Sequence, residues 1–353
     1  MVRHNPAPSP ALDGVPRRGG RGPSMADVAR EAGVSGQTVS RVANGKTNVD
    51  AATRERVLTA MRRVGYRPNS AARALRNGQF RSIGVIISAL PTFGNIRTLD
   101  AVAAAVVTEG FSIILMPVTR PTQGEVAGAF SRLNEQAVDG VIILIEQHQL
   151  DQSEIELPQG LPVVVIDSSA SYDYPIVDTD QAQGAAAATR HLLDLGHRTV
   201  WHIAGPPQSY AAERRRKSWQ ATLADAGREV PPVLTGDWSA RSGYDHGLRL
   251  AADPRVTAVF AANDQMALGL LRALHETGRT VPGDMSVVGF DDMDESAYFW
   301  PPLTTIRQSF EAVGMHAVAA LLTEIATDVR AAAPVTVPTE LVLRASTAPP
   351  PQW

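Results

Sequence analysis

The clearest chemical pattern in the chain lies near its amino terminus, in the run ADVAREAGVSGQTVSRVANG at residues 26–45. Ser24 and Ser35 are suited to cap the start of a helix, because a serine hydroxyl accepts a hydrogen bond from the free amides there. Gly33 can end the first helix, since glycine tolerates the left-handed conformation that often follows one. The spacing therefore predicts two short helices joined by a tight turn.

The second of these helices would present a polar face suited to reading DNA. Val39 and Val42 are expected to point inward, which leaves these residues facing outward: Gly36, Gln37, Ser40 and Arg41. The major groove admits an α-helix, and there Gln can pair with adenine and Arg with guanine. The alternative is an ordinary helical hairpin with a polar surface. We favour a helix-turn-helix because the spacing, the caps and the outward side chains agree.

A second group of candidates follows from the elements expected after residue 80. Short apolar runs alternate there with amphipathic stretches, at residues 83–87, 111–116, 140–145, 163–167, 199–205, 257–263 and 286–292. Continuous apolar strands between helices predict parallel sheets covered on both faces, in two doubly wound halves. Ligands in such folds bind at the carboxyl ends of strands. That rule selects four polar residues: Ser88, Asp167, Asn263 and Asp291.

Charge is divided unevenly along the 353 residues. Residues 1–80 hold 14 Lys and Arg against 5 Asp and Glu, a net charge of +9. The remainder holds 19 against 31, a net charge of −12, so the chain as a whole carries −3. A basic front on an acidic body is typical of a DNA-binding domain attached to a second domain. The length also predicts two or three domains.

Several classes of protein are disfavoured by what the sequence lacks. It contains no GxGxxG after a strand, no GxxxxGK[ST], no GxSxG and no HExxH, so we expect neither an enzyme nor a bound cofactor or metal. It has no Cys, which fits a reducing cytoplasm. The sequence contains no apolar stretch of about 18 residues, so it predicts no membrane-spanning helix. The first residues lack the apolar centre of a signal peptide and are expected to form a disordered basic tail.

The chain resembles the lactose-repressor (LacI/GalR) family of bacterial transcription regulators, from about Ser24 to about Ser346. The family opens with this helix-turn-helix, followed by a third helix, here residues 51–64 with Asp50 as N-cap, then YRPN at 66–69 and a short hinge helix at 70–78. The resemblance implies these DNA contacts: Ser35, Gly36, Gln37, Thr38, Ser40, Arg41, Asn44, Thr53, Tyr66, Asn69, Ala72 and Leu75.

The resemblance also implies how the rest of the chain is organised. The body should be similar to periplasmic sugar-binding proteins, with two lobes joined by crossover strands and an effector bound between them. We expect one lobe at 81–179 plus 310–338, and the other at 180–307 plus a carboxyl-terminal strand. The whole chain then divides into these regions: a tail at 1–22, the helix-turn-helix domain at 23–68, the hinge at 69–80, the effector-binding and dimerisation domain at 81–347, and a tail at 348–353.

Four segments of the second half are especially close to the family's eponymous member: DWSARSG at 237–243, ANDQMALG at 262–269, GFDD at 289–292 and PPLTTIRQ at 301–308. They imply an effector pocket built from Ser88, Arg120, Asp167, Arg215, Trp238, Asn263, Asp291, Gln308 and Phe310. Carboxylates and amides accept from hydroxyls, a guanidinium supplies a fork of donors, and an indole offers a flat apolar face to a sugar ring. The pocket chemistry therefore indicates a sugar.

A purely structural role remains an alternative for several of these residues. Asp167, Asn263 and Asp291 could cap helices after strands, Arg215 lies in a charged run that could be a solvated helix face, and Trp238 could belong to a core. The chain also departs from the eponymous member. Ala211 stands where that protein has a hydroxyl, Gly36 replaces a large DNA-reading side chain, and Thr92, Gly94 and Asn95 replace a mostly apolar loop. These departures bear on the exact sugar and operator.

We interpret the chain as a cytoplasmic repressor that binds a palindromic stretch of double-stranded operator DNA and is released by a sugar, such as a galactoside or another glycoside. The family's leucine-heptad tetramerisation tail is missing from the terminal APPPQW, which favours a homodimer. A relative that needs a corepressor, either a purine or a phosphoprotein partner, is the first alternative. A sugar solute-binding protein is the second, although it would need a secretion signal and no DNA-binding head.

Overall fold

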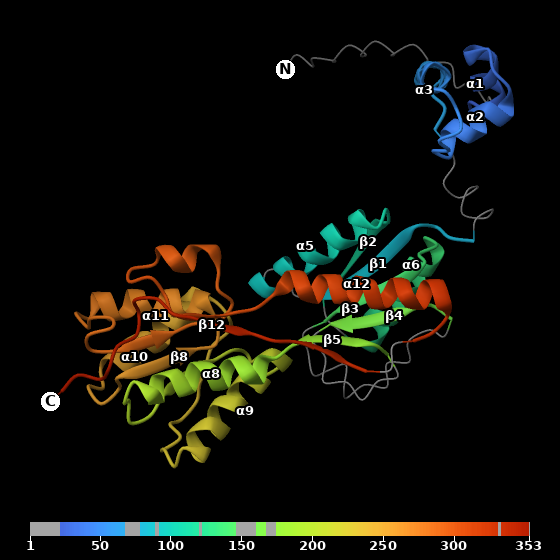
Figure 1. Cartoon of the computed structure of the whole chain (residues 1–353). Coiled ribbons are helices and arrows are strands. Elements are labelled where there is room, and N and C mark those ends of the chain that lie inside the picture. Colours follow the sequence, from blue (N-terminus) through green and yellow to red (C-terminus); the bar gives the residue numbers. More distant parts are fainter. Residues whose placement is uncertain are drawn as a thin grey trace, which may run out of the picture. The chain divides into compact units, whose positions relative to one another are not determined.

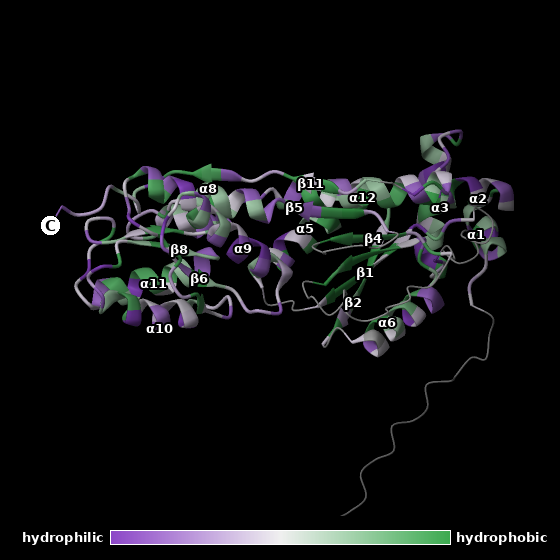
Figure 2. Cartoon of the chain, turned by 90° about the horizontal axis from the view of Figure 1, so that it is seen from below, coloured by the Kyte–Doolittle hydropathy of each residue, from purple (hydrophilic) through white to green (hydrophobic). Residues whose placement is uncertain are grey.

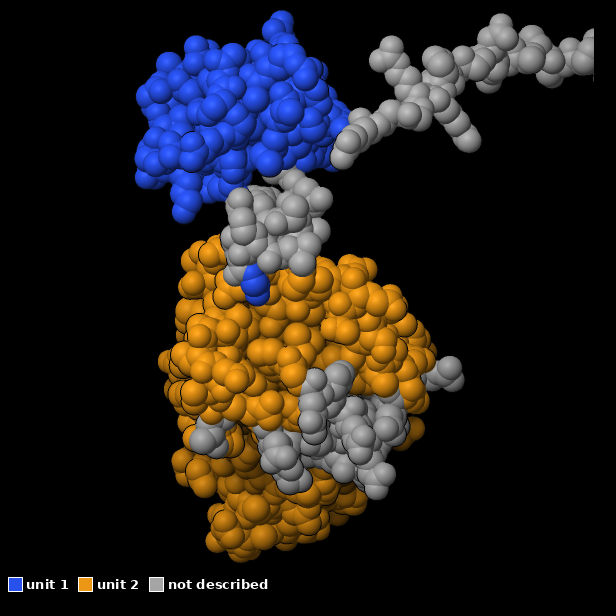
Figure 3. All heavy atoms as spheres, turned by 90° about the vertical axis from the view of Figure 1, so that its right-hand side faces the viewer, with its two compact units in different colours: residues 1–78 blue, residues 79–353 orange. Residues whose placement is uncertain are grey.

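The computed structural model describes residues 22–67, 78–88, 92–119, 122–145, 160–166, 174–330 and 333–352. It divides into two compact units, residues 1–78 and 79–353, which Figure 3 distinguishes by colour. Several predicted features lie outside the described residues: nearly all of the amino-terminal tail, the hinge helix with Asn69, Ala72 and Leu75, and the effector candidates Arg120 and Asp167.

In its described residues, the first unit contains three helices, α1 (Met25–Ala32), α2 (Gly36–Ala43) and α3 (Ala51–Val64). Each begins at the cap that the sequence predicts, because a side-chain oxygen of the residue before it accepts an amide hydrogen bond: Ser24, Ser35 and Asp50. Their inward faces share one core, formed by Val28, Val39, Val42, Val57, Ala60 and Met61. The unit therefore has its own hydrophobic centre.

The second unit begins with a lobe built on a six-stranded parallel sheet. Its order is β11-β5-β4-β3-β1-β2, with bounds β1 (Ser82–Ser88), β2 (Ser112–Val118), β3 (Gly140–Leu144), β4 (Val163–Ile166), β5 (Ile176–Thr179) and β11 (Val335–Val337). Helices α5 (Phe93–Thr108) and α12 (Phe310–Thr327) cover one face, and α6 (Gln123–Glu135) covers the other. Figure 1 shows α5 and α12 running beside this sheet.

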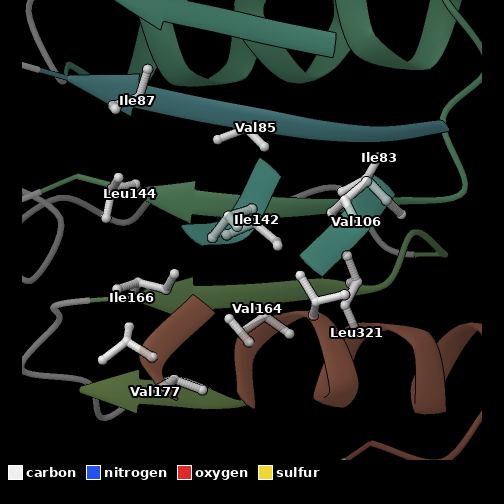
Figure 4. Close-up of a cluster of buried hydrophobic side chains, with 14 of the residues drawn as sticks. Ile83, Val85, Ile87, Val106, Ile142, Leu144, Val164, Ile166, Val177 and Leu321 are labelled. Atoms are coloured by element: carbon white, nitrogen blue, oxygen red, sulfur yellow. The ribbon is translucent and has the colours of Figure 1, made fainter. Parts of the chain in front are cut away.

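Successive side chains of these strands enter two different cores, as expected for a sheet buried on both faces. Figure 4 shows the core under α5 and α12, which brings together Ile83, Val85 and Ile87 of β1, Leu321 of α12 and residues of the neighbouring strands. The alternate residue Ile86 joins the other core, beneath α6. This double burial explains why β1, β3 and β4 are almost entirely apolar.

The second lobe is built on a four-stranded parallel sheet in the order β7-β6-β8-β9, with bounds β6 (Trp201–Ala204), β7 (Leu234–Thr235), β8 (Ala258–Ala261) and β9 (Ser286–Val288). Helices α8 (Gln181–Asp194) and α9 (Tyr210–Asp225) pack on one face, and α10 (Ala240–Ala251) and α11 (Asp264–Glu276) on the other. The predicted α/β fold with two parallel sheets behind a helix-turn-helix is confirmed.

The chain passes between the lobes at residues 179–181, 307–310 and 337–340. The last two passages are joined by an antiparallel pair, β10 (Thr305–Arg307) with β12 (Glu340–Val342). A short 3₁₀ helix, η1 (Asp294–Tyr298), follows β9. These crossings link the two lobes near the carboxyl ends of their strands, which is where the site described below lies.

Figure 2 shows the apolar residues gathered on the strands of both sheets, with mixed colours along the helices. Among the described residues, α12 alone is long and apolar enough to cross a membrane by length and composition. It packs against α5 and against β3, β4 and β5 of the first lobe. That packing is typical of a core helix.

One buried histidine makes the core of the second lobe sensitive to acid. His202 of β6 is fully buried and stacks on Phe260, with ring centroids 4.7 Å apart. Its Nδ1 donates to the Phe260 carbonyl oxygen at 2.9 Å, and its Nε2 has no hydrogen-bond partner in the described part of the chain. Burial lowers the pKa of His202 from 6.5 to about 3. The folded protein therefore keeps this ring neutral.

We predict that His202→Leu reduces the acid sensitivity of the fold. As pH falls below the ordinary pKa of 6.5, His202 becomes protonated in the unfolded chain. In the folded chain it stays neutral until about pH 3. The wild type should therefore lose about 2 kcal/mol more unfolding free energy than His202→Leu between about pH 7.5 and about pH 5. Urea unfolding at both pH values measures this, with His275→Gln at an exposed histidine as control. Equal losses in wild type and His202→Leu would contradict it.

Candidate DNA-binding and effector sites

The predicted DNA-reading face lies on the outside of α2. Gln37 and Arg41 are exposed and one turn apart, and the side chain of neither makes a hydrogen bond or an ion pair among the described residues. Gly36 and Ser35 are exposed at the start of the same helix, while Val39 and Val42 on the inner side belong to the core. The free functional groups of this helix therefore point away from the unit.

The remaining described candidates of this face have local structural roles as well. Ser35 accepts the Thr38 amide at 3.1 Å, and the Asn44 side chain donates to the Ser40 carbonyl oxygen at 2.6 Å. Thr53 donates its amide to the Asp50 cap at 2.9 Å. The partly buried Tyr66 packs against the hydrophobic core. The contacts of Ser35 and Asn44 fix the two ends of α2, whereas that of Thr53 fixes the start of α3.

A cavity between the two lobes of the second unit, called here the inner cavity, collects most of the effector candidates. Arg215, Trp238, Asn263, Asp291, Gln308 and Phe310 all line it. The first lobe contributes the start of α5, with Thr92, Phe93, Gly94 and Asn95, and the second lobe adds Gln181 and Ala211. The carboxyl ends of β8 and β9 lie at this point, as the rule for parallel sheets predicts.

Four buried side chains in the inner cavity form a ring of polar contacts. Arg215 Nε donates to Gln181 Oε1 at 2.8 Å, and Gln181 Nε2 donates to Gln308 Oε1 at 3.1 Å. Gln308 Nε2 then donates to Asp291 Oδ1 at 2.7 Å, and this oxygen lies 3.6 Å from Arg215 Nη2. The last contact is an ion pair that is longer than a direct hydrogen bond, and it completes the ring. We call this set the polar ring.

The guanidinium of Arg215 is held in place by further contacts. Nη1 donates to the Ala262 carbonyl oxygen, and the group lies 3.7 Å from the centre of the Phe290 ring and 5.5 Å from that of Trp238. Only 4% of Arg215 is exposed, so it does not lie on a solvated helix face. Desolvating a cation is costly unless it is paired, and these contacts offset that cost.

Trp238 and Asp291 both adopt left-handed backbone conformations, with φ of 72° and 111°. Such conformations strain residues other than glycine and often occur at binding sites. A side chain at Gly205 would collide with the indole of Trp238, because its Cβ would lie 2.4 Å from the ring. The position of this tryptophan therefore depends on a glycine at the end of β6.

A second carboxylate lies behind the polar ring. Asp264, at the start of α11, is fully buried and accepts from the hydroxyls of Ser296 at 2.6 Å and Thr305 at 2.5 Å and from the Met293 amide at 2.9 Å. Burial, and next the charge of Asp291, raise the pKa of Asp264 to about 7, although the three donors oppose this shift. Asp264 thereby links α11 to η1 and to β10.

Two predicted effector residues behave differently from the rest. Ser88 ends β1 as expected, but it is absent from the inner-cavity lining, and its carbonyl oxygen accepts from the Asn95 side chain at 3.0 Å. Asn263 combines two roles: it caps α11 by accepting the Met266 amide at 2.9 Å, and it lines the inner cavity. Asp291 is not a helix cap.

Sequence reasoning missed two residues of the inner cavity, Gln181 and Phe93. Gln181 lies two residues beyond the carboxyl end of β5, and the strand-end rule would have pointed to this position if the four-residue β5 had been recognised. Phe93 opens the helix after β1, where it resembles a core residue. No group of three or more His, Asp or Glu suited to a metal ion occurs within the described ranges.

The fold and site thus define a two-domain transcription regulator, with a helix-turn-helix head and a periplasmic-binding-protein-like body. Profile matches agree: residues 24–69 match bacterial regulatory proteins of the lacI family, and residues 189–347 match the periplasmic binding protein-like domain. The chain belongs to the lacI family of bacterial regulatory proteins. Members of this family are DNA-binding repressors with an allosteric effector domain.

Individual relatives cover nearly the whole chain. The lactose operon repressor of Escherichia coli (strain K12) is 36% identical over 303 residues, which are 85% of this chain and 84% of the relative. The HTH-type transcriptional repressor PurR of Haemophilus influenzae (strain PittEE) is 33% identical over 308 residues, or 86% and 91%. A crystal structure of the lac repressor dimer bound to operator and the anti-inducer ONPF matches with a TM-score of 0.83 at 34% identity, covering 93% of this chain and 100% of that one.

We predict that Arg41→Ala weakens binding to operator DNA from the gene's own upstream region by about 1–3 kcal/mol and relaxes sequence preference. The exposed guanidinium can donate two hydrogen bonds to one guanine. Mobility shifts on operator and on random DNA measure both effects. Arg241→Ala, at an exposed arginine of the second unit, should change neither. An equal loss of affinity on operator and random DNA would show that Arg41 only contacts phosphate.

Proposed function

We propose that this repressor binds a palindromic operator and that a neutral sugar, a galactoside or another glycoside, releases it. The pairing of a buried carboxylate with a buried guanidinium in the lining of the inner cavity carries the proposal. A hydroxyl in the cavity that contacts both groups would donate to Asp291 and accept from Arg215. Alcohol groups are the natural partners for such a pair.

The rest of the inner cavity supports a sugar in the same way. Gln181, Gln308 and Asn263 offer amide donors and acceptors, and Trp238 offers an aromatic face for the C–H side of a sugar ring. The carboxylate of Asp291 in the cavity lining disfavours a phosphorylated ligand, because like charges repel. A neutral glycoside satisfies these groups without introducing a charge.

A purine corepressor is the second candidate. Its support is the 33% identity to the PurR repressor of Haemophilus influenzae, together with the aromatic side chains Phe93, Trp238 and Phe310 in the cavity. The two candidate effectors would have opposite effects on operator binding. A sugar inducer weakens operator binding, whereas a corepressor strengthens it, so one titration with both kinds of compound distinguishes them.

We also propose that the protein is a homodimer and that it acts in the cytoplasm. We propose the same domain boundaries as those predicted from the sequence. The second unit exposes large apolar side chains, among them Tyr298 at 88% and Trp300 at 91%. Exposed apolar groups of this size are typical of interfaces. The solved relative bound to operator is a dimer. Sedimentation of the whole chain distinguishes this dimer from a monomer or a tetramer.

We predict that Arg215→Met abolishes the response to sugar and leaves operator binding nearly unchanged without sugar. The variant removes the donor fork of the polar ring but keeps an apolar contact for Phe290, and the helix-turn-helix forms a separate unit. Operator titrations with and without lactose, other galactosides, guanine and adenine measure the response. Arg216→Met, at the next residue of α9, is the matched control and should respond as the wild type does.

Two outcomes would contradict this assignment. If Arg215→Met released operator at the same sugar concentration as the wild type, Arg215 would not belong to the effector site. If the variant failed to bind operator even without sugar, the role of Arg215 would be structural. Stronger operator binding with guanine or adenine, and no effect of any sugar, would replace induction by corepression.

A further inference from the structure

Helix α9 of the second lobe lies along the first crossing between the lobes, at residues 179–181. Arg215 Nε donates to Gln181 Oε1 at 2.8 Å, and one turn further along α9 the Ser218 hydroxyl donates to the Ala182 carbonyl oxygen at 2.6 Å. The first of these contacts belongs to the polar ring. Helix α9 therefore connects the polar ring to the segment that leads from one lobe to the other.

A third contact of α9 reaches beyond the crossing into the first lobe. The guanidinium of Arg214 pairs with the carboxylate of Asp178 on β5, the strand between β4 and β11 in the six-stranded sheet. Among the ion pairs of the described residues, this pair alone joins an element of the first lobe to an element of the second. Arg214 directly precedes Arg215, so one helix carries both the polar ring and a contact with the opposite lobe.

Burial distinguishes this ion pair from those on the surface. Exposed pairs contribute little to stability, whereas a buried carboxylate is costly unless a partner compensates it. The side chain of Asp178 is only 6% exposed, and that of Arg214 is 32% exposed. The guanidinium also lies 5.3 Å from the centre of the Tyr210 ring, which begins α9. Asp178 therefore favours an arrangement of the lobes in which Arg214 can reach it.

The inner cavity depends on the same arrangement, because its lining comes from both lobes. Phe93 and Asn95 line it from the first lobe, and Trp238 and Asp291 line it from the second. Turning one lobe away from the other would separate these two walls. A ligand that contacts both walls then binds only the fraction of molecules in which the walls are together, and its apparent affinity falls with that fraction.

We infer that the ion pair between Arg214 and Asp178 is a lock between the lobes, which holds them in the arrangement that binds the effector. This inference rests on the proposed function, because it places the effector in the inner cavity, but it applies to a sugar and to a purine alike. Neither residue lines the inner cavity. Arg214 and Asp178 are therefore positioning residues, which act on the effector only through the relative placement of the lobes.

Calorimetric titration of the whole chain with lactose, D-galactose, guanine and adenine tests the lock. Arg214→Met and Asp178→Asn should each weaken the compound that binds best by about tenfold, because fewer molecules hold both walls of the cavity together. The double variant should lose no more than the weaker-binding single variant, since the two side chains act as one pair. Lys217→Met, which removes an ion pair with Glu213 inside α9, is the matched control and should leave the affinity unchanged.

Amide hydrogen exchange tests the lock without any ligand. The first and last crossings meet where the Asp180 amide donates to the Val337 carbonyl oxygen and the Thr339 amide donates to Gln183 Oε1, both at 2.8 Å. In the three variants of the pair, the amides of these crossings should exchange at least about fivefold faster than in the wild type. The amides of α11, within the second lobe, should keep their rates. Faster exchange throughout both lobes would show a general loss of stability and would overturn the lock.

Three further results would overturn the lock. Both single variants could keep the wild-type affinity, the losses could add up in the double variant, or exchange at the crossings could stay unchanged. In these cases effector binding itself, and with it the proposed function, would still stand. If guanine or adenine bound and neither sugar did, the proposed sugar inducer would fail, and the same variants would still test the lock with the purine. If none of the compounds bound, the exchange rates alone would decide.

Discussion

The buried guanidinium of Arg215 is the constraint on which the proposed effector site depends. A cation withdrawn from water must be compensated, and here Gln181, the Ala262 carbonyl oxygen, Asp291 and the Phe290 ring compensate it. These partners come from different elements of the second lobe, and Gln308 ties them to the crossing toward the first lobe. A ligand that binds to Arg215 and Asp291 would therefore act on the segments that connect the lobes. A ligand shifts an equilibrium only by its differential affinity, and this position makes such a difference possible.

The DNA-binding unit is independent of that network because it has its own caps and its own core. Ser24, Ser35 and Asp50 fix the three helix starts, and the valines of α2 are buried against α3. The outward residues Gln37 and Arg41 contribute nothing to that core, so they are available for reading bases. The same separation lets operator preference and effector preference vary independently. Independent change of this kind is consistent with the residues that differ from the lactose repressor. Gly36 differs in the first unit, and Thr92, Gly94 and Asn95 differ in the second.

Much of the fold could be predicted from the sequence, because local signals and long-range order agree. Serine and aspartate caps marked the first three helices, and the ends of the long apolar runs marked Asn263 and Asp291. The polar ring could not be predicted in the same way. Gln181 follows a strand of only four residues, and Arg215 meets the Ala262 carbonyl 47 positions away. Such contacts arise only when separate elements pack, and no local pattern records them. Thr92, Gly94 and Asn95, which were noted as differing from the lactose repressor, do line the inner cavity from the first lobe.

If the effector relieves repression, operator DNA and sugar must weaken each other's binding by the same factor, because linkage between two sites is reciprocal. Calorimetric titration of the sugar into free protein, and into protein saturated with operator, measures this factor directly. We expect the sugar to bind the operator complex about 5–150-fold more weakly than the free protein, the usual range of such coupling. Equal affinities would show that the site does not communicate with DNA. Tighter binding to the operator complex, by the sugar or by a purine base, would contradict induction and establish corepression.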